Sequence, residues 1–350
     1  MKHDILSMTL QELETVVLSI GEPKFRAKQI YGWMIKGAGF DEMRNISSKT
    51  IDALKSCCEL RLPKIVTRLD SALDGTKKYL FELLDGECIE SVFMEYEHGN
   101  TLCISSQVGC RMGCKFCAST INGKVRDLTP SEMLGQIIVA QKDTGKRISN
   151  VVMMGIGEPL DNYDNTIKFL RLVSSPENLN IGLRHISVSS CGLVDKIDAL
   201  ALEGLPITLS ISLHAYDDDV RSEIMPVNKK FSIHELLSAC QRYFDKTGRR
   251  ISFEYTLIAN KNDTIEGAIA LAGVLKKYIK STPHVNLIPL NEVKETGLST
   301  SKNVNLFKNK LISLGINATV RRRLGSDINA SCGQLRRQSQ KSDKKGTSNL

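Results

Sequence analysis

Three cysteines in the stretch CRMGCKFC, namely Cys110, Cys114 and Cys117, carry the clearest chemical signal in the sequence. Their C-x₃-C-x₂-C spacing brings three thiolate ligands into one short loop, and such ligands bind zinc or iron–sulfur clusters. Zinc sites usually combine two C-x₂-C pairs, although Cys103 or Cys332 could supply a distant fourth ligand here. A cluster held by three cysteines leaves one iron open for a substrate or cofactor. The spacing favours the cluster.

Polar or reactive residues also follow several of the other predicted strands. GIGEP follows VVMM, SCG follows HISVS, SLH ends LPITLSIS, Asn291 follows HVNLIPL, and Cys332 lies in GSDINASCGQL. GIGEP is a poor dinucleotide-binding loop, because it lacks the third glycine of G-x-G-x-x-G and has Glu-Pro where the helix should begin. His214 and Cys103 would each fit a core position if taken alone. Together, the loops indicate a functional site at one edge of a sheet.

Strand-like runs alternate with helical runs from residue 101 onward. We expect strands at 101–107, 150–154, 184–190, 206–212, 250–257, 284–290 and 317–323. The clearest helices are 130–143, with Thr129 as N-cap and Pro130 in the first position, and 231–246. The alternation predicts a parallel sheet with right-handed crossovers, either a full or incomplete (β/α) barrel or a doubly wound sheet. Both architectures place functional loops at the C-terminal ends of the strands.

The N-terminal part of the chain has a different pattern. Residues 1–60 read as helices, beginning with a capping box at 9–12. The stretch KFRAKQIYGWMIKG predicts a helix whose apolar face is formed by Phe25, Ile30, Trp33 and Met34. Its basic side chains could contact RNA phosphates or simply face solvent. The runs KKYLFELLDG and ECIESVFMEY predict a β-hairpin that turns at Asp85-Gly86.

Composition indicates a soluble protein of a reducing compartment. The 350 residues are 41% hydrophobic and 25% charged, with no run of about 20 apolar residues. The N-terminus does not resemble a signal peptide, so we expect a cytoplasmic protein without a membrane partner. The ten cysteines are then thiols or ligands, and five are expected to be small buried hydrophobic residues: Cys57, Cys58, Cys88, Cys191 and Cys240. The net charge of +8 is compatible with a polyanion partner.

Seven motifs in a fixed order give a resemblance to a known family. They are CRMGCKFCAST, MMGIGEPLDN, LSISLHA, RSEIMPVN, GRRISFEY, HVNLIPLN and INASCGQLR. Together they resemble the bacterial adenine C2-methyltransferases of 23S ribosomal RNA and tRNA, within the radical S-adenosylmethionine superfamily. The resemblance runs from GEPKFRAKQIYGW to CGQLR, with SSCG and DINASCGQL where the family commonly has STSG and DIDAACGQL. A related group that methylates C8 of the same adenine has GMGEALAN and CATG in place of GIGEPLDN and CAST. C2 is therefore favoured, with the C8 enzyme and a zinc-containing RNA-binding protein as alternatives.

The resemblance implies a fold and cofactors. The fold is an α/β partial (β/α) barrel of the radical S-adenosylmethionine type over 96–336, with an accessory RNA-binding domain at 1–95 and a basic disordered tail at 337–350. One 4Fe-4S cluster is expected on Cys110, Cys114 and Cys117, with S-adenosylmethionine on its open iron. The expected contacts of S-adenosylmethionine are Gly157, Glu158, Ser189, Ser212, Leu213, His214 and Asn291.

The resemblance also implies roles for residues outside the cluster loop. Cys332 is expected to accept a methyl group from one S-adenosylmethionine, and a radical made from a second molecule activates that methyl group for addition to adenine C2. Glu90 is the expected proton acceptor, and Cys103 is expected to release the RNA by forming a transient disulfide with Cys332. The implied partners are 23S rRNA, tRNA and an external electron donor such as flavodoxin, and the implied oligomeric state is a monomer.

Overall fold

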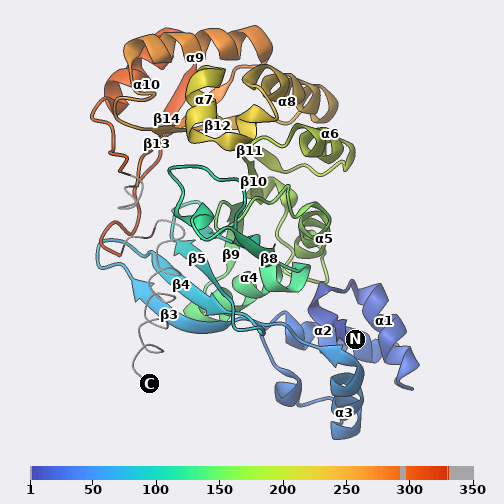
Figure 1. Cartoon of the computed structure of the whole chain (residues 1–350). Coiled ribbons are helices and arrows are strands. Elements are labelled where there is room, and N and C mark those ends of the chain that lie inside the picture. The colour runs from blue at the N-terminus through green and yellow to red at the C-terminus, as the bar shows by residue number, and fades with distance from the viewer. Residues whose placement is uncertain (1, 292–296, 329, 331–350) are drawn as a thin grey trace.

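A ten-stranded sheet organises the chain (Figure 1). The computed structural model describes residues 2–291, 297–328 and 330. The strand order is β14-β13-β12-β11-β10-β9-β6-β5-β4-β3. The strands are β3 (Lys64–Asp70), β4 (Lys77–Glu82), β5 (Cys88–Met94), β6 (Asn100–Cys103), β9 (Ile148–Met153), β10 (Ile186–Ser190), β11 (Thr208–Ser212), β12 (Ile251–Leu257), β13 (His284–Pro289) and β14 (Asn317–Val320).

The parallel part of the sheet is a partial barrel and not a doubly wound sheet. From β6 through β9 to β14, each strand pairs in parallel with the next one along the chain. A doubly wound sheet would reverse this order at a switch point, and no reversal occurs among the described strands. Helices connect the strands along one side of the sheet in Figure 1. They are α4 (Pro130–Thr144), α5 (Tyr163–Ser174), α6 (Val194–Leu202), α7 (Asp218–Ile224), α8 (Ile233–Thr247), α9 (Ile265–Tyr278) and α10 (Val304–Ser313).

Local sequence signals fix the two longest of these helices. The Thr129 side chain accepts a hydrogen bond from the Glu132 backbone, Pro130 follows the cap, and α4 ends at Gly145 with φ +65°. Helix α8 has the same design, with a capping box at Ser232 and a glycine of positive φ at its C-terminus. Both helices therefore begin where an N-cap satisfies free backbone N–H groups and end where glycine allows the left-handed conformation.

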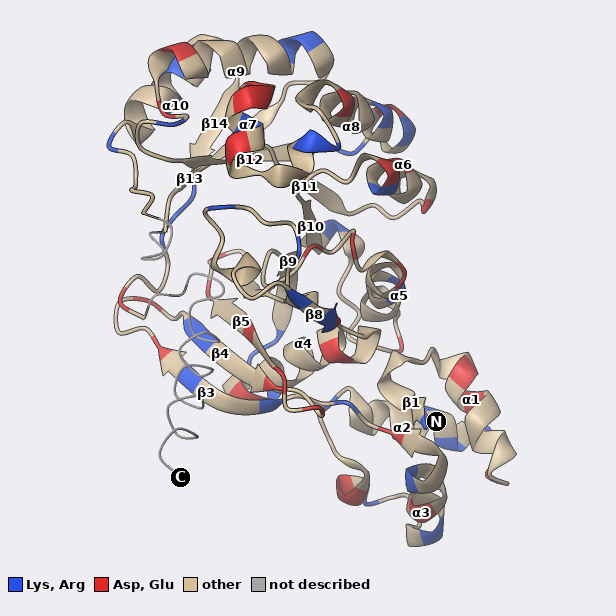
Figure 2. Ribbon diagram, viewed as in Figure 1, with Lys and Arg blue, Asp and Glu red and all other residues tan. Residues whose placement is uncertain are grey.

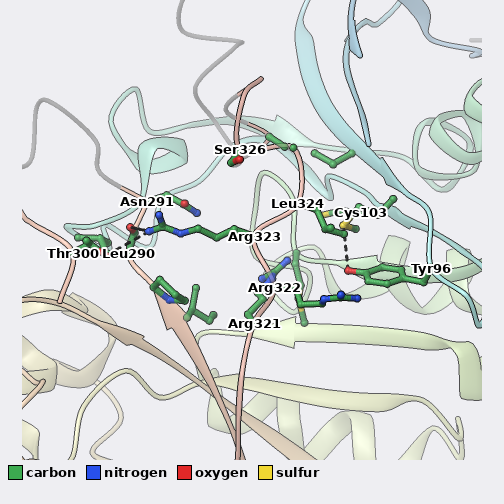
Figure 3. Close-up of a pocket in the computed structure, with 17 residues that line it drawn as sticks. Tyr96, Cys103, Leu290, Asn291, Thr300, Arg321, Arg322, Arg323, Leu324 and Ser326 are labelled. Atoms are coloured by element: carbon green, nitrogen blue, oxygen red, sulfur yellow. Dashed lines mark hydrogen bonds between the residues drawn. The ribbon is translucent and has the colours of Figure 1, made fainter. Parts of the chain in front are cut away.

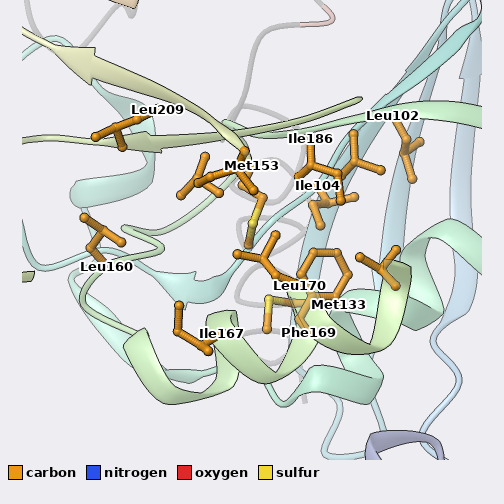
Figure 4. Packing of buried hydrophobic residues seen from close by; sticks show 14 of the residues in the cluster. Leu102, Ile104, Met133, Met153, Leu160, Ile167, Phe169, Leu170, Ile186 and Leu209 are labelled. Atoms are coloured by element: carbon orange, nitrogen blue, oxygen red, sulfur yellow. The ribbon is translucent and has the colours of Figure 1, made fainter. Parts of the chain in front are cut away.

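The main core lies between the sheet and these helices (Figure 4). Fully buried side chains of the parallel strands, such as Leu102 and Ile186, pack with Phe169 and Leu170 of α5 and with Met133 of α4. Burial of a side chain of this size contributes about 1.5–3 kcal/mol. This packing holds the strands in register, and the register places the loops at their C-terminal ends side by side.

One strand prediction needs correction. The predicted strand 101–107 is divided into β6 and β7 (Gln107–Gly109), and β7 leaves the main sheet to pair with β8 (Lys124–Asp127). The predicted hairpin is present, but β3, β4 and β5 extend the main sheet through the antiparallel pairing of β5 with β6. The division expected near residue 95 stays a prediction.

The N-terminal helices lie outside the sheet, and the short turn Ile5–Ser7 that precedes them contacts α4 and α5 (Figure 1). They are α1 (Leu10–Ser19), α2 (Phe25–Met34) and α3 (Ser48–Cys57), with a short parallel pair formed by β1 (His3–Asp4) and β2 (Cys58–Glu59). The predicted capping box at 9–12 is present. Phe25 does not lie on the buried face as predicted: it is 57% exposed at the start of α2, with the Arg26 guanidinium over its ring. None of the described helices could span a membrane.

Candidate active site

The cysteine loop is held between β7 and β8. Gly109 has φ +77°, and a Cβ at this position would lie 2.0 Å from the backbone oxygen of Gly123, so the hairpin requires glycine there. The Cys110 backbone N–H donates to that same Gly123 oxygen over 3.0 Å, and the Lys115 N–H donates to the Ile224 oxygen over 2.9 Å. The loop is therefore fixed at its base and in its middle by backbone hydrogen bonds.

The three cysteines line a cavity of about 220 Å³ at the C-terminal ends of the parallel strands. Burial raises the pKa of all three thiols, that of Cys110 to about 12. Without a metal these groups are protonated, so thiolates form here only when iron or another cation compensates their charge. No group of three or more His, Cys, Asp or Glu side chains in the described part of the chain is arranged to hold a metal ion. A cubane cluster, whose ligands bind separate irons, fits the three thiols better than one zinc ion does.

The GIGEP loop forms a second wall of this cavity. Gly157 has φ +110°, and a Cβ there would lie 2.6 Å from Cβ of Gln107, so only glycine fits. The Glu158 carboxylate is buried and accepts hydrogen bonds from the backbone of Leu160 and Cys191, over 3.1 and 2.7 Å. Burial raises the pKa of Glu158, while these hydrogen bonds act in the opposite direction. The carboxylate thus joins the ends of two neighbouring strands.

His214 is a neutral hydrogen-bond donor at the third wall. Its Nδ1 accepts the backbone N–H of Thr256 over 2.9 Å, and burial lowers its pKa to about 3. The single proton of the neutral ring therefore sits on Nε2. His214 also has φ +55°, an uncommon value for a residue other than glycine, and its ring meets the Phe116 ring of the cysteine loop edge-on. Such strain is typical of a side chain that is held in place for binding.

The structure brings most of the predicted cofactor residues together. Five line the cysteine cavity: Gly157, Glu158, Ser189, Ser212 and His214. Leu213 is fully buried in the main core and does not line this cavity, and Asn291 lines the adjoining cavity described below. Sequence reasoning did not select Cys191, Glu254, Thr256 or Arg321, which also line the cysteine cavity. Cys191 is buried as predicted, and its position after β10 was a signal for a site residue.

A larger cavity of about 560 Å³ adjoins the cysteine cavity (Figure 3). Cys103 at the end of β6 lies in its wall, and Arg321, Arg322 and Arg323 reach it from the segment after β14. Met154, Ile288 and Arg321 line both cavities. The two cavities are therefore neighbours with part of their walls in common.

Glu90 lies beside this larger cavity in an ion pair. Its carboxylate is 3.1 Å from Lys78 Nζ, and both side chains are 1% exposed. Lys78 pairs with Val92 across β4 and β5, and Val92 pairs with Cys103 across β5 and β6. Since side chains alternate along a strand, Glu90 shares the face of β5 that carries Val92. Its charge raises the pKa of Cys103, although burial has the larger effect.

The segment after β14 is tied to the turn between β3 and β4. The Gly325 N–H donates to the Asp74 carboxylate over 3.0 Å, and the Asp327 carboxylate accepts from Ser71 Oγ and the Ala72 N–H. Leu324 and Ala330 pack against the apolar cluster that contains Cys103. Cys332 lies outside the described residues; it follows Ala330 by two positions in the sequence.

Comparisons with known proteins agree with this geometry. The radical SAM superfamily model matches residues 104–272, and the model of the ribosomal RNA large subunit methyltransferase N-terminal domain matches residues 3–60. A protein of Clostridium botulinum (strain Eklund 17B / Type B), described as a probable dual-specificity RNA methyltransferase RlmN, is 54% identical over 95% of this chain and 96% of its own length. One of Clostridium perfringens (strain 13 / Type A) with the same description is 52% identical over 95% of this chain and 96% of its own length.

The chain belongs to the RlmN family. A solved structure supports this: a radical SAM methyltransferase from Sphaerobacter thermophilus has 39% sequence identity and a TM-score of 0.90, over 95% of this chain and 98% of that one. The chain is thus a radical S-adenosylmethionine RNA methyltransferase, as the motifs predicted. Its family uses a 4Fe-4S cluster and S-adenosylmethionine. The buried thiols and the neutral donor at His214 fit these groups.

Proposed function

We propose that this RlmN-family enzyme methylates C2 of an adenine in 23S rRNA, and of an adenine in tRNA, with Cys332 as the methyl carrier. The observation that supports this most directly is the junction of the two cavities. The cysteine cavity suits the cluster and S-adenosylmethionine, while the larger cavity is lined by Cys103 and three arginines. An adenine in the larger cavity would lie beside Cys103 and next to the cavity that suits the cofactor.

Cys110, Cys114 and Cys117 would ligate the cluster through three irons. Gly157, Glu158, Ser189, Ser212 and His214 line the same cavity and would contact S-adenosylmethionine, His214 as an Nε2–H donor. Leu213 would contribute from its backbone, and Asn291 from the boundary of the larger cavity. The bound cluster and S-adenosylmethionine supply one-electron chemistry, which an electron-poor carbon such as adenine C2 requires.

Cys332, Cys103 and Glu90 would carry out the remaining steps of methyl transfer and release. Cys332 takes the methyl group on its sulfur and becomes linked to adenine C2 through that carbon. Glu90, held by Lys78, would accept the proton that leaves C2. The Cys103 thiolate then attacks the sulfur of Cys332, so that an S–S bond forms and the carbon–sulfur bond breaks with its electron pair passing to carbon; that carbon takes up a proton to complete the methyl group, and the methylated RNA leaves. Burial raises the pKa of Cys103, and the charge of Arg321 opposes that shift.

The target adenine must leave its stack to enter a cavity of this depth, so the RNA must be accessible there. Arg321, Arg322 and Arg323 at the larger cavity offer positive charge to its phosphates. The basic face of the N-terminal helices is weaker evidence for an RNA surface. Figure 2 shows acidic residues beside the basic ones there, and Lys24 and Lys55 form ion pairs with Glu14 and Asp41. We further propose a monomer in the cytoplasm that receives electrons from a donor such as flavodoxin.

Product analysis tests this proposal. Protein purified without air should contain about four irons and four sulfides per chain. Incubated with 23S rRNA, or separately with tRNA, and with S-adenosylmethionine and a reductant, it should yield 2-methyladenosine after nuclease digestion. A Cys114→Ala variant is the matched control, because it lacks one cluster ligand. Mainly 8-methyladenosine would reverse the assignment to C2, and a colourless protein with one zinc would contradict the enzyme mechanism.

A further inference from the structure

Arg221 is a fully buried arginine behind the cysteine cavity, in the motif RSEIMPVN that the mechanism above does not use. It lies on α7, and its guanidinium joins the ends of two parallel strands. Nη2 donates to the backbone oxygens of Cys191 and Ser212, over 2.7 and 3.1 Å, and Nε donates to Leu213 over 3.0 Å. Nη1 donates to Oδ1 of Asn228 over 3.0 Å. All four acceptors are uncharged.

The guanidinium is fully hydrogen-bonded, but among the described residues no carboxylate lies within 4.0 Å of it. A buried charge without an opposite charge is costly, and an arginine stays protonated in proteins. Burial lowers the pKa of Arg221, and the largest opposing influences are the thiol groups of Cys191 and Cys114, followed by the carboxylate of Asp218. Nη2 donates to the Cys191 oxygen, and Cys191 and Cys114 both line the cysteine cavity, so negative charge bound in that cavity would lie beside Arg221.

An iron–sulfur cluster on three thiolates would supply that charge. Net charge, burial and hydrogen bonding set the reduction potential of such clusters, and reduction adds one electron to an already anionic group. A fixed positive charge beside the cavity stabilises the reduced form more than the oxidised form. We propose that Arg221 is a positioning and electrostatic residue that raises the reduction potential of the cluster and so makes it accessible to the electron donor. The inference rests on the proposed function.

The surroundings of Arg221 place it beside the cysteine loop and not only at the strand ends. Helix α7 lies against the cysteine loop: the Lys115 N–H donates to the Ile224 oxygen at the end of α7 over 2.9 Å, and Cys114 packs in one apolar cluster with Ile224 and Cys191. Gly192 leaves room for it: a Cβ there would lie 3.4 Å from Nη2 and 2.9 Å from Leu236. A lysine at 221 would keep the charge and lose most of the hydrogen bonds. A methionine would lose both.

Redox titration of the reconstituted protein, followed by electron paramagnetic resonance without RNA, tests the proposal. In Arg221→Met the equilibrium constant for cluster reduction should fall about tenfold or more, equal to about 59 mV for a one-electron couple. Arg221→Lys should retain most of the wild-type potential. Arg242→Met is the matched control and should leave it unchanged, because Arg242 pairs with Asp198 on the exposed side of α8.

Iron and sulfide content, together with thermal unfolding of the cluster-free chains, must first match the wild type. If Arg221→Met does not fold, Arg221→Gln, which removes the charge and keeps an amide donor, carries the same prediction. Unchanged potentials in the neutral variants would overturn the inference, as would an equal fall in Arg221→Lys, which would indicate hydrogen bonding and not charge. Failure of the wild-type chain to bind a cluster would instead overturn the proposed function.

Discussion

Replacement of Lys78 by methionine should destabilise the fold far more than the loss of an ordinary surface ion pair. Lys78 on β4 and Glu90 on β5 are each 1% exposed, and Lys78 Nζ lies 3.1 Å from the Glu90 carboxylate. Lys78→Met leaves the Glu90 carboxylate buried without its lysine. Breaking a buried pair from one side in this way costs about 3–5 kcal/mol.

The neighbouring residue provides a matched control on the same strand. Lys77 pairs with Asp70, but their side chains are 24% and 40% exposed. Water screens this pair, so Lys77→Met should cost only about 0–1 kcal/mol. Urea unfolding of the anaerobically purified proteins, followed by circular dichroism, gives both differences in the free energy of unfolding.

A double variant, Lys78→Met with Glu90→Leu, separates a lost charge partner from lost packing. Apolar replacement of a whole buried pair is often neutral or stabilising, so the second change should recover most of the loss. Equal costs for Lys78→Met and Lys77→Met would refute the reasoning. A double variant whose loss equals the loss of Lys78→Met plus that of Glu90→Leu alone would also refute the reasoning. The two charges would then act independently of each other.

Three further predictions concern the site. Gly157→Ala, which places a Cβ against Gln107 at a positive φ, should abolish S-adenosylmethionine binding by equilibrium dialysis, whereas Gly86→Ala, also at positive φ but in open space, should not. His214 has a pKa of about 3 in the folded chain and about 6.5 when unfolded, so the unfolded state binds more protons between these values. Wild-type stability should therefore fall by up to about 1.4 kcal/mol per pH unit below 6.5, and His214→Gln should remove that slope in urea unfolding. Cys103→Ala should accumulate a nuclease-sensitive covalent protein–RNA species on denaturing gels, and Cys332→Ala should not; two inactive, RNA-free variants would make Cys103 structural.

The sequence predicts the parallel part of the fold well, because each strand and helix there carries its own local signals. The alternation of strands and helices, the caps at Thr129 and Gly145 and the order of the elements all agree with the structure. The division of the strand predicted at 101–107 could not be seen locally. It depends on the pairing of β7 with β8, which lies on the other side of the cysteine loop in the sequence. Such a tertiary contact is not visible in the local pattern of residues 101–107. The exposure of Phe25 is likewise decided by what packs beside α2, and helical periodicity does not contain that information.

The parts of the site formed by one contiguous motif could be predicted from the sequence. The parts formed by residues that strand pairing brings together could not. The cysteine loop and the glycine-containing loop after β9 are contiguous motifs. The nearness of Glu90 to Cys103 follows from pairing across β4, β5 and β6, which no single stretch of sequence encodes. Arg321 reaches both cavities only because the end of β14 lies beside β13. Arg221 donates three of its four hydrogen bonds to backbone oxygens, so those three partners have no side-chain signature in the sequence.

The contact between Asp327 and the turn at Ser71 and Ala72 joins parts of the chain 256 and 255 residues apart, and this sets an order of assembly during translation. At about 5–20 residues per second, the turn is made about 13–51 s before its carboxylate partner. A nascent chain can therefore complete the cysteine hairpin and the helices around β9 to β11 while the larger cavity still lacks its last wall. The arginine-lined cavity is completed only after residues 321–330 have been made, so a chain that stops before them carries the three cysteines of the loop without that cavity.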